Sequence, residues 1–518
     1  MMLKLKKGTV TFRNPQIFAV DTKRVVLERV LTKLFMLIYT EGVTLTLKVK
    51  TEHNIKSLMG YVDVLEQEGL VSNAFKNSDA VEDWLRSNLL EMVFRGNVVK
   101  EKVSSLKPMH LLSFRIQNLK YCRDYNTSDQ LYFMLRCCPE VHSGLKQYLC
   151  KGWDTGTNSA VRCADLDVDT TGILYLVKGL KETRSLNTRE TPEPLLRKQS
   201  DLFNDDIRRL LVYQEKLPRS VFIEYFKILC GFHLTLYTMK LVYLLPQMVD
   251  QGRIDVEDDW SLIVDVTDNL NSKISKYAKE DFEKNENYYR QYIRATYSID
   301  VAQNWLSRND TKVSIAQTLR KIKEGLKDEY FNIRLQDVVS ELPSESDKEF
   351  DKKDYEEQFK YFNGFSSFQK FVYLLESSNL GFSQYKYLRE FIDAVSMKNS
   401  PSKLLADGRS RKYPRRGALG SKLLETLVQI LVLEPVDDGK YQSRSLSIDE
   451  LARLIRSRYG LIINGIGDSR FKNADVETCS AFKENMDAFK NKLRQIGFYT
   501  DLSDAYLLQK IRPRYNFN

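Results

Sequence analysis

Hydrophobic residues recur at helical spacing through most of this chain. Apolar positions follow the i, i+3, i+4 pattern from residue 22 to 39 and in seven segments between residues 199 and 397. Short apolar or alternating runs at 43–49 and 261–266 are the clearest predicted strands. The later helices are expected near 202–215, 219–245, 269–283, 286–307, 311–327, 352–378 and 384–397. The pattern predicts a mainly α fold with small β elements (α+β) and several domains.

The N-terminal part of the chain mixes helical and strand patterns. A helix predicted over 53–68 stops at Gly69, just before the apolar pair Leu70-Val71. A helix that ends in this way can enter a hairpin, so 20–75 is compatible with a winged-helix-like unit. An α+β domain without that unit is the favoured alternative. Three regions are predicted before the C-terminal part: an α+β domain at 1–152, an irregular Gly-, Thr- and Pro-containing connection at 153–198, and a helical domain at 199–397.

One apolar stretch, 226–248, is long enough to cross a bilayer. Lys227, His233 and Lys240 interrupt it, and Pro246 lies near its end. Polar residues at these intervals favour a buried central helix over a membrane span. Because the N-terminus also lacks an apolar signal segment, a cytoplasmic protein without a membrane partner is expected.

The C-terminal region shows an ordered series of local signals. A wide apolar helix is predicted from Ser421 to Leu433, and a second helix opens with the capping box Ser447–Glu450 and stops at Gly460. A third helix is expected over about 480–496, and it is followed by a hairpin. This order predicts a winged-helix domain at 421–518, preceded by a basic linker at 398–420.

Charge is concentrated in the same region. Residues 398–518 contain 22 Lys or Arg and 14 Asp or Glu, so +8 of the net charge of +10 lies there. A basic module on a nearly neutral body indicates a polyanion partner, and double-stranded DNA is expected. The alternatives are a solvated basic face and a winged helix that docks protein. The predicted DNA contacts are Arg409, Arg411, Lys412, Arg415 and Arg416 in the linker, Lys483, Lys490, Lys492 and Arg494 on the third helix, and Lys510, Arg512 and Arg514 beyond the hairpin.

Catalytic chemistry has little support in the sequence. The chain has four His and seven Cys without a CxxC pair, and it carries no Walker A, GxSxG or HExxH motif. No cofactor or metal is therefore expected, and the protein is predicted not to be an enzyme. The alternative is a metal-dependent nuclease that uses Asp165, Asp167 and Asp169, which would share one face of an extended strand. Aspartates in a polar turn are the favoured interpretation, also for Asp265 with Asp268.

Two helices carry aromatic stripes, at 286–307 and 352–378. Packing between long helices explains stripes at this spacing. A third hypothesis for the whole chain is a scaffold that lacks direct DNA contact, in which these two helices serve as interaction surfaces.

The runs ELARLIRSRYGLIING at 450–465 and FKENMDAFKNKLRQIGFYTDLSDAYLLQKIRPRY at 482–515 are similar to the ends of accessory proteins in bacterial multigene anti-phage systems. The resembling proteins belong to methylation-associated defence and related restriction-like systems. The resemblance covers about the last hundred residues. It implies a subunit that recognises or holds DNA for a larger complex, with an ATPase or a methyltransferase as partner. It carries over no catalytic residue.

Overall fold

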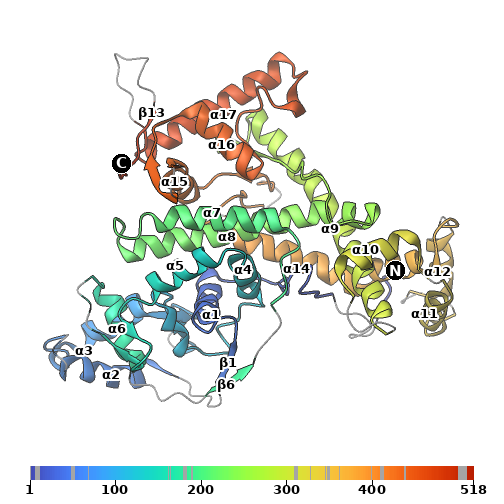
Figure 1. Ribbon diagram of the computed structural model, residues 1–518. Coiled ribbons are helices and arrows are strands. Elements are labelled where there is room, and N and C mark those ends of the chain that lie inside the picture. The colour runs from blue at the N-terminus through green and yellow to red at the C-terminus, as the bar shows by residue number, and fades with distance from the viewer. Residues whose placement is uncertain are drawn as a thin grey trace.

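The computed structural model describes most of the chain. The described residues are 2–5, 12–47, 53–67, 69, 71–97, 99–161, 163, 165–178, 184–187, 191–308, 313–326, 328–344, 346, 350–360, 362–397, 399–408, 413–436, 439–499 and 510–517. Figure 1 shows α7 (Arg197–Leu211) and α8 (Arg219–Gln251) crossing the middle of the molecule, with the N-terminal half on one side and the C-terminal region on the other. The fold is mainly α with small β elements, as the hydrophobic pattern predicts.

Helix α8 is the centre of the core. It has the length and apolarity of a membrane span, and 89% of its most apolar window is buried inside the structure. His233 is fully buried within it, and the helix continues through Pro246 before Gly252 ends it with a positive φ of 71°. The predicted buried central helix is confirmed, because helices from both halves of the chain pack against α8.

The N-terminal half packs α1 (Leu27–Tyr39) against α4 (Thr127–Leu135) and against α8. Strand β1 (Thr44–Leu47) pairs with β6 (Arg184–Asn187), far along the chain, and α2 (Ile55–Gln67) leads into α3 (Ser78–Trp84). Among the described residues between α2 and α3 there is one short 3-10 helix, η1 (Phe75–Asn77), and no strand. The winged-helix-like unit at 20–75 stays a prediction. The remaining elements are β2 (Leu90–Val93), β3 (Lys102–Leu106), α5 (Pro139–Leu149), β4 (Trp153–Asp154), β5 (Ser159–Ala160) and α6 (Val168–Lys178).

A second long helix, α9 (Lys273–Leu306), runs from the C-terminal region to a helical arm. Two helices are predicted here, at 269–283 and 286–307, but the chain has no Gly or Pro between them. Asn285 stays in the helix because its Nδ2 donates to the Asp281 carbonyl and its Oδ1 accepts from Trp260 Nε1. The arm contains α10 (Ile315–Glu324), α11 (Asp328–Ser340), α12 (Lys352–Phe359), α13 (Ser367–Ser377) and α14 (Asn379–Ser396).

The aromatic stripes of these helices are mainly core. Tyr289 and Tyr292 of α9 are buried, as are Phe368 and Phe371 of α13. Phe331 packs edge-on against Phe368 at a centroid distance of 5.0 Å. Core packing, the favoured explanation of the stripes, is confirmed for these residues.

A three-stranded parallel sheet joins the C-terminal region to the body. Its central strand β7 (Leu262–Asp265) comes from the middle of the chain and pairs with β12 (Leu461–Ile462) and β8 (Gly417–Ala418). The strand predicted at 261–266 is confirmed. Around the sheet lie α15 (Ser421–Leu431), β9 (Leu433–Pro435), β10 (Tyr441–Ser443), β11 (Leu446–Ser447), α16 (Ile448–Tyr459), α17 (Val476–Gln495) and β13 (Lys510–Ile511).

Candidate functional site

Helix α17 carries four of the predicted DNA contacts, and it is fixed to the sheet by a buried asparagine. Asn485 Oδ1 accepts from the Val266 amide, and its Nδ2 donates to the carbonyls of Val264 and Ile463. These bonds tie the helix to the carboxyl ends of β7 and β12. The opposite face of α17 is therefore presented to solvent in a set orientation.

That outer face has mixed charge. Lys483 and Arg494 are exposed, but Glu484 and Asp487 lie among them and are not buried. Lys490 is half-buried, with its ammonium 5.3 Å from the centroid of the Tyr499 ring. The helix alone is thus less basic than its Lys and Arg content indicates.

Lys492 lies on the inner side of the same helix. Its Nζ donates to the Leu419 carbonyl at 2.5 Å, and burial lowers its pKa. An ammonium group in this position serves the packing between α17 and the segment before α15. Lys492 is therefore not one of the exposed cations of α17.

The described arginines of the predicted linker also hold the fold together. Both nitrogens of the Arg415 fork engage Asp393 on α14, with Nε donating to Oδ1 at 3.0 Å. Arg416 is buried, and its Nε donates to the equally buried Asp265 at 2.7 Å. Neither side chain is available to DNA phosphates in this arrangement. The contacts predicted for Arg409, Arg411 and Lys412 lie outside the described residues.

The edge formed by β13 keeps exposed cations. Lys510 and Arg512 are exposed on and just after this strand, which pairs with β11 beside the start of α16. Arg514 lies 4.2 Å from the centroid of the Phe498 ring and donates to the Ile496 carbonyl and to Glu425. Residues 500–509, where most of the predicted hairpin falls, lie outside the described residues.

The three aspartates of the nuclease alternative do not form one site. Asp165 pairs with Lys151 at 2.8 Å, and Asp167 accepts from the Thr170 amide at the start of α6. Asp169 accepts from Trp84 Nε1 at 2.7 Å and lies within α6, so the predicted extended strand is wrong. Among the described residues no group of three or more His, Cys, Asp or Glu could hold a metal ion. The second candidate, Asp265, is engaged by Arg416.

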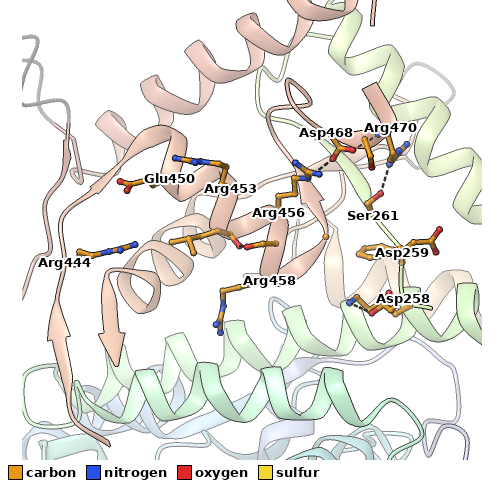
Figure 2. A pocket seen from close by; sticks show the side chains of 16 residues that line it. Asp258, Asp259, Ser261, Arg444, Glu450, Arg453, Arg456, Arg458, Asp468 and Arg470 are labelled. Carbon is orange, nitrogen blue, oxygen red and sulfur yellow. Dashed lines mark hydrogen bonds and ion pairs between the residues drawn. The ribbon is translucent and has the colours of Figure 1, made fainter. Parts of the chain in front are cut away.

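Sequence reasoning missed a cleft of about 830 Å³ between α16 and the segment that joins α8 to β7. Figure 2 shows Arg453, Arg456 and Arg458 of α16 on one side of the cleft, together with Glu450 of the same helix, and Asp258 and Asp259 on the other side. The two walls lie about two hundred residues apart in the chain. The only sequence signal for the cleft was therefore the spacing of Arg453, Arg456 and Arg458. The charged residues that line the cleft are Arg444, Arg453, Arg456, Arg458, Arg470, Lys240, Asp258, Asp259, Glu450 and Asp468.

Two of these arginines are held in place by buried carboxylates. Arg456 Nε donates to Asp468 at 2.7 Å, and Asp468 is only 4% exposed. Arg470 donates to Ser261 Oγ at 2.8 Å and to the buried Asp281. These contacts fix the two guanidinium groups at the cleft, Arg456 on α16 and Arg470 beside Ser261 of the α8–β7 segment.

Arg453 is held differently. Among the described residues Arg453 forms no ion pair, and its one hydrogen bond there runs from Nε to the Asp449 carbonyl at 3.4 Å. The hydrogen bonds to Ser447 lower the pKa of Glu450 on the same helix, and the charges of Arg444 and Arg453 help to lower it. The Arg453 side chain is exposed on α16. The cleft therefore contains a guanidinium fork whose terminal nitrogens are not committed to an ion pair within the described chain.

Behind the cleft, a buried network connects α16 to the body. Asp206 on α7 accepts from Tyr459 OH at 2.8 Å and from Arg458 at 2.6 Å. The same carboxylate lies 2.9 Å from His233 Nε2 on α8. Burial, together with the Asp206 charge, raises the pKa of Tyr459 well above its ordinary value. The network fixes α16, and so the arginine wall, relative to α7 and α8.

No curated protein matches this chain. The family model of the methylation-associated defense system protein MAD7 matches residues 7–515. The match extends over nearly the whole chain, whereas the resemblance seen in the sequence was confined to about its last hundred residues. The chain therefore belongs to the MAD7 family of methylation-associated defense system proteins.

Proposed function

We propose that this protein is a non-enzymatic, cytoplasmic subunit of a methylation-associated anti-phage defence complex, and that it contacts duplex DNA through its C-terminal region. The observation that carries the proposal is the concentration of charge, +8 within residues 398–518. The exposed cations of this region include Lys483 and Arg494 on α17 and Lys510 and Arg512 at β13. Exposed Lys and Arg side chains displace condensed counterions from DNA, which gives affinity without sequence readout.

The order of elements supports a winged helix as the DNA-binding unit. Helices α15, α16 and α17 follow one another, and β13 pairs with β11, which directly precedes α16. In DNA-binding helix-turn-helix proteins the last helix of the motif lies in the major groove. In this proposal α17 approaches the duplex with Lys483 and Arg494, and the β13 edge contacts phosphates.

The assembly part of the proposal rests on family membership. A defence system protein acts with other components, and an ATPase or a methyltransferase is the partner that we propose. If the purified protein bound a partner but no DNA, the protein-docking scaffold would be the better description.

A charge-reversal experiment tests the DNA contact. Fluorescence anisotropy would compare the full chain with the double variant Lys483→Glu, Arg494→Glu on a labelled duplex at one low salt concentration. Because two phosphate contacts are lost and repulsion is added, we expect affinity to fall by about tenfold or more. The matched control is Lys198→Glu, an exposed lysine on α7, which should leave affinity unchanged. Equal losses in the double variant and the control would contradict the proposal.

A further inference from the structure

We propose that the cleft between α16 and the α8–β7 segment binds the phosphate of a nucleotide, either a free nucleotide or the terminal nucleotide of a nucleic-acid strand. This goes beyond the duplex contact proposed for α17 and β13 and does not depend on it. The cations that line the cleft are mostly arginines: they make up five of the six cationic residues, and three of them, Arg453, Arg456 and Arg458, come from α16.

Arginine in place of lysine points to a phosphate ligand. The guanidinium group presents planar, paired donors that match two oxygens of a phosphate, whereas a lysine ammonium is a point charge. Arg456 uses its Nε for Asp468, and Arg453 forms no ion pair within the described part of the chain. The terminal nitrogens of Arg453 therefore provide the binding fork, and Arg456 lies one helical turn away on the same face.

The fixed geometry of the wall favours binding. Arg456 and Arg470 are oriented by the buried carboxylates of Asp468 and Asp281, and Arg458 by Asp205 and Asp206. Side chains that are already immobilised lose little further entropy when a ligand arrives. The wall is thus organised before the ligand binds, and of the three α16 arginines only Arg453 remains to be ordered.

The side chains of the opposite wall indicate a ligand that carries hydrogen-bond donors as well as an anion. Asp259 accepts a hydrogen bond from Tyr243 OH at 2.9 Å and has no cationic partner among the described residues. A carboxylate in this position would repel a bare phosphate but would accept hydrogen bonds from the hydroxyls of a sugar or the amino group of a base. A nucleotide carries both kinds of group, an anion and donors, on one molecule.

The size of the cleft fits this class of ligand. Small-molecule sites usually enclose about 300–1,000 Å³, and this cleft has about 830 Å³. A duplex, by contrast, requires a broad convex or grooved surface such as that proposed for α17 and β13. The ligand of the cleft is therefore a single nucleotide unit or the end of a strand.

The test is isothermal titration calorimetry on the full-length protein with three probes: ADP, 5′-phosphorylated hexathymidylate and an octaglutamate peptide. We expect ADP or the phosphorylated oligonucleotide to bind and octaglutamate not to bind at the same concentration. Binding of ADP alone identifies a free nucleotide as the ligand, and binding of the oligonucleotide identifies a strand end. Absence of binding by both nucleotide probes, or equally tight binding of octaglutamate, would overturn the proposal.

Two substitutions locate the site. Arg453→Gln removes an exposed guanidinium that has no ion pair within the described chain, so the fold should persist, and nucleotide affinity should fall about tenfold or more. Arg453→Lys keeps the charge but loses the fork, so we expect an intermediate affinity. If Arg453→Gln bound nucleotide as tightly as the unaltered protein, the cleft would not be the site.

The Lys483→Glu, Arg494→Glu variant separates the two proposals. It should retain nucleotide binding while duplex affinity falls, because neither residue lines the cleft. Loss of nucleotide binding in this variant would contradict the assignment of the nucleotide to the cleft. Failure of duplex binding alone would leave the cleft proposal intact.

Discussion

Single buried side chains determine how the C-terminal region is held. Asp206 accepts hydrogen bonds from two side chains of α16 and lies beside His233 on α8. Asp265 on β7 forms an ion pair with Arg416. Sequence alone presented Arg416 as a basic linker residue, since nothing in its neighbourhood reveals a carboxylate 151 positions away. In the structure Arg416 is buried, so its role is structural. A buried ion pair that loses one partner leaves an uncompensated charge, which is strongly destabilising.

Asp300 on α9 gives a prediction for pH dependence. Burial raises its pKa from 3.8 to about 7. Because the folded state holds this proton more tightly than the unfolded state, the stabilisation is complete below about pH 4 and is lost as pH rises towards 7. Above that range the folded state carries a buried charge that the unfolded chain would expose to water. Asp300→Asn should therefore raise stability at pH 8 and flatten the pH dependence.

Urea unfolding of the full chain at pH 5 and at pH 8 would measure this effect. Asn304 Nδ2 donates to Asp300 Oδ2 at 3.2 Å, and the amide oxygen of the substituted side chain can accept the same bond. The control is Asp201→Asn, an exposed carboxylate of α7 paired with Arg197. A pH dependence in Asp300→Asn as steep as in the unaltered protein would show that Asp300 does not cause it.

Elements with local signals were predictable, and those that depend on distant partners were not. Helix α16 begins at the Ser447–Glu450 capping box and ends at Gly460 with a positive φ of 74°, as predicted. The partner of strand β1 could not be placed, because β6 lies far along the chain. The extended strand that the nuclease alternative required at Asp165–Asp169 is absent, and here the missed signal was local. Alternating carboxylates resemble a strand face, but Asp167 caps a helix.

The pairing of β8 with β7 gives a prediction at the scale of elements. A Cβ added to Gly417 would lie 2.2 Å from the Ile263 carbonyl oxygen, a backbone atom that cannot move aside cheaply. We expect Gly417→Ala to destabilise the protein by about 2 kcal/mol, since overpacking typically costs about 1–3 kcal/mol. Gly364→Ala, where the added carbon meets nothing within 4 Å, is the matched control. Thermal unfolding midpoints that fall equally in the two variants would contradict a specific role for Gly417.

Across the whole molecule, segments far apart in the chain build the functional surfaces. The three-stranded sheet takes one strand from the middle of the chain and two from near its end, and the cleft lies between the same parts. Hydrophobic spacing predicted the helical body and the three C-terminal helices, because both follow from local periodicity. It could not predict the cleft, since no local pattern records which distant segment forms the second wall.

The central claim is that the C-terminal region contacts duplex DNA through exposed cations. The most direct test is the affinity of the full-length protein for a labelled duplex over a series of salt concentrations. Each phosphate contact contributes a slope of about −0.9 to log Kobs against log salt. With Lys483, Arg494, Lys510 and Arg512 in contact, we predict a slope of about −3 or steeper. Weak binding with a slope near zero would contradict the claim.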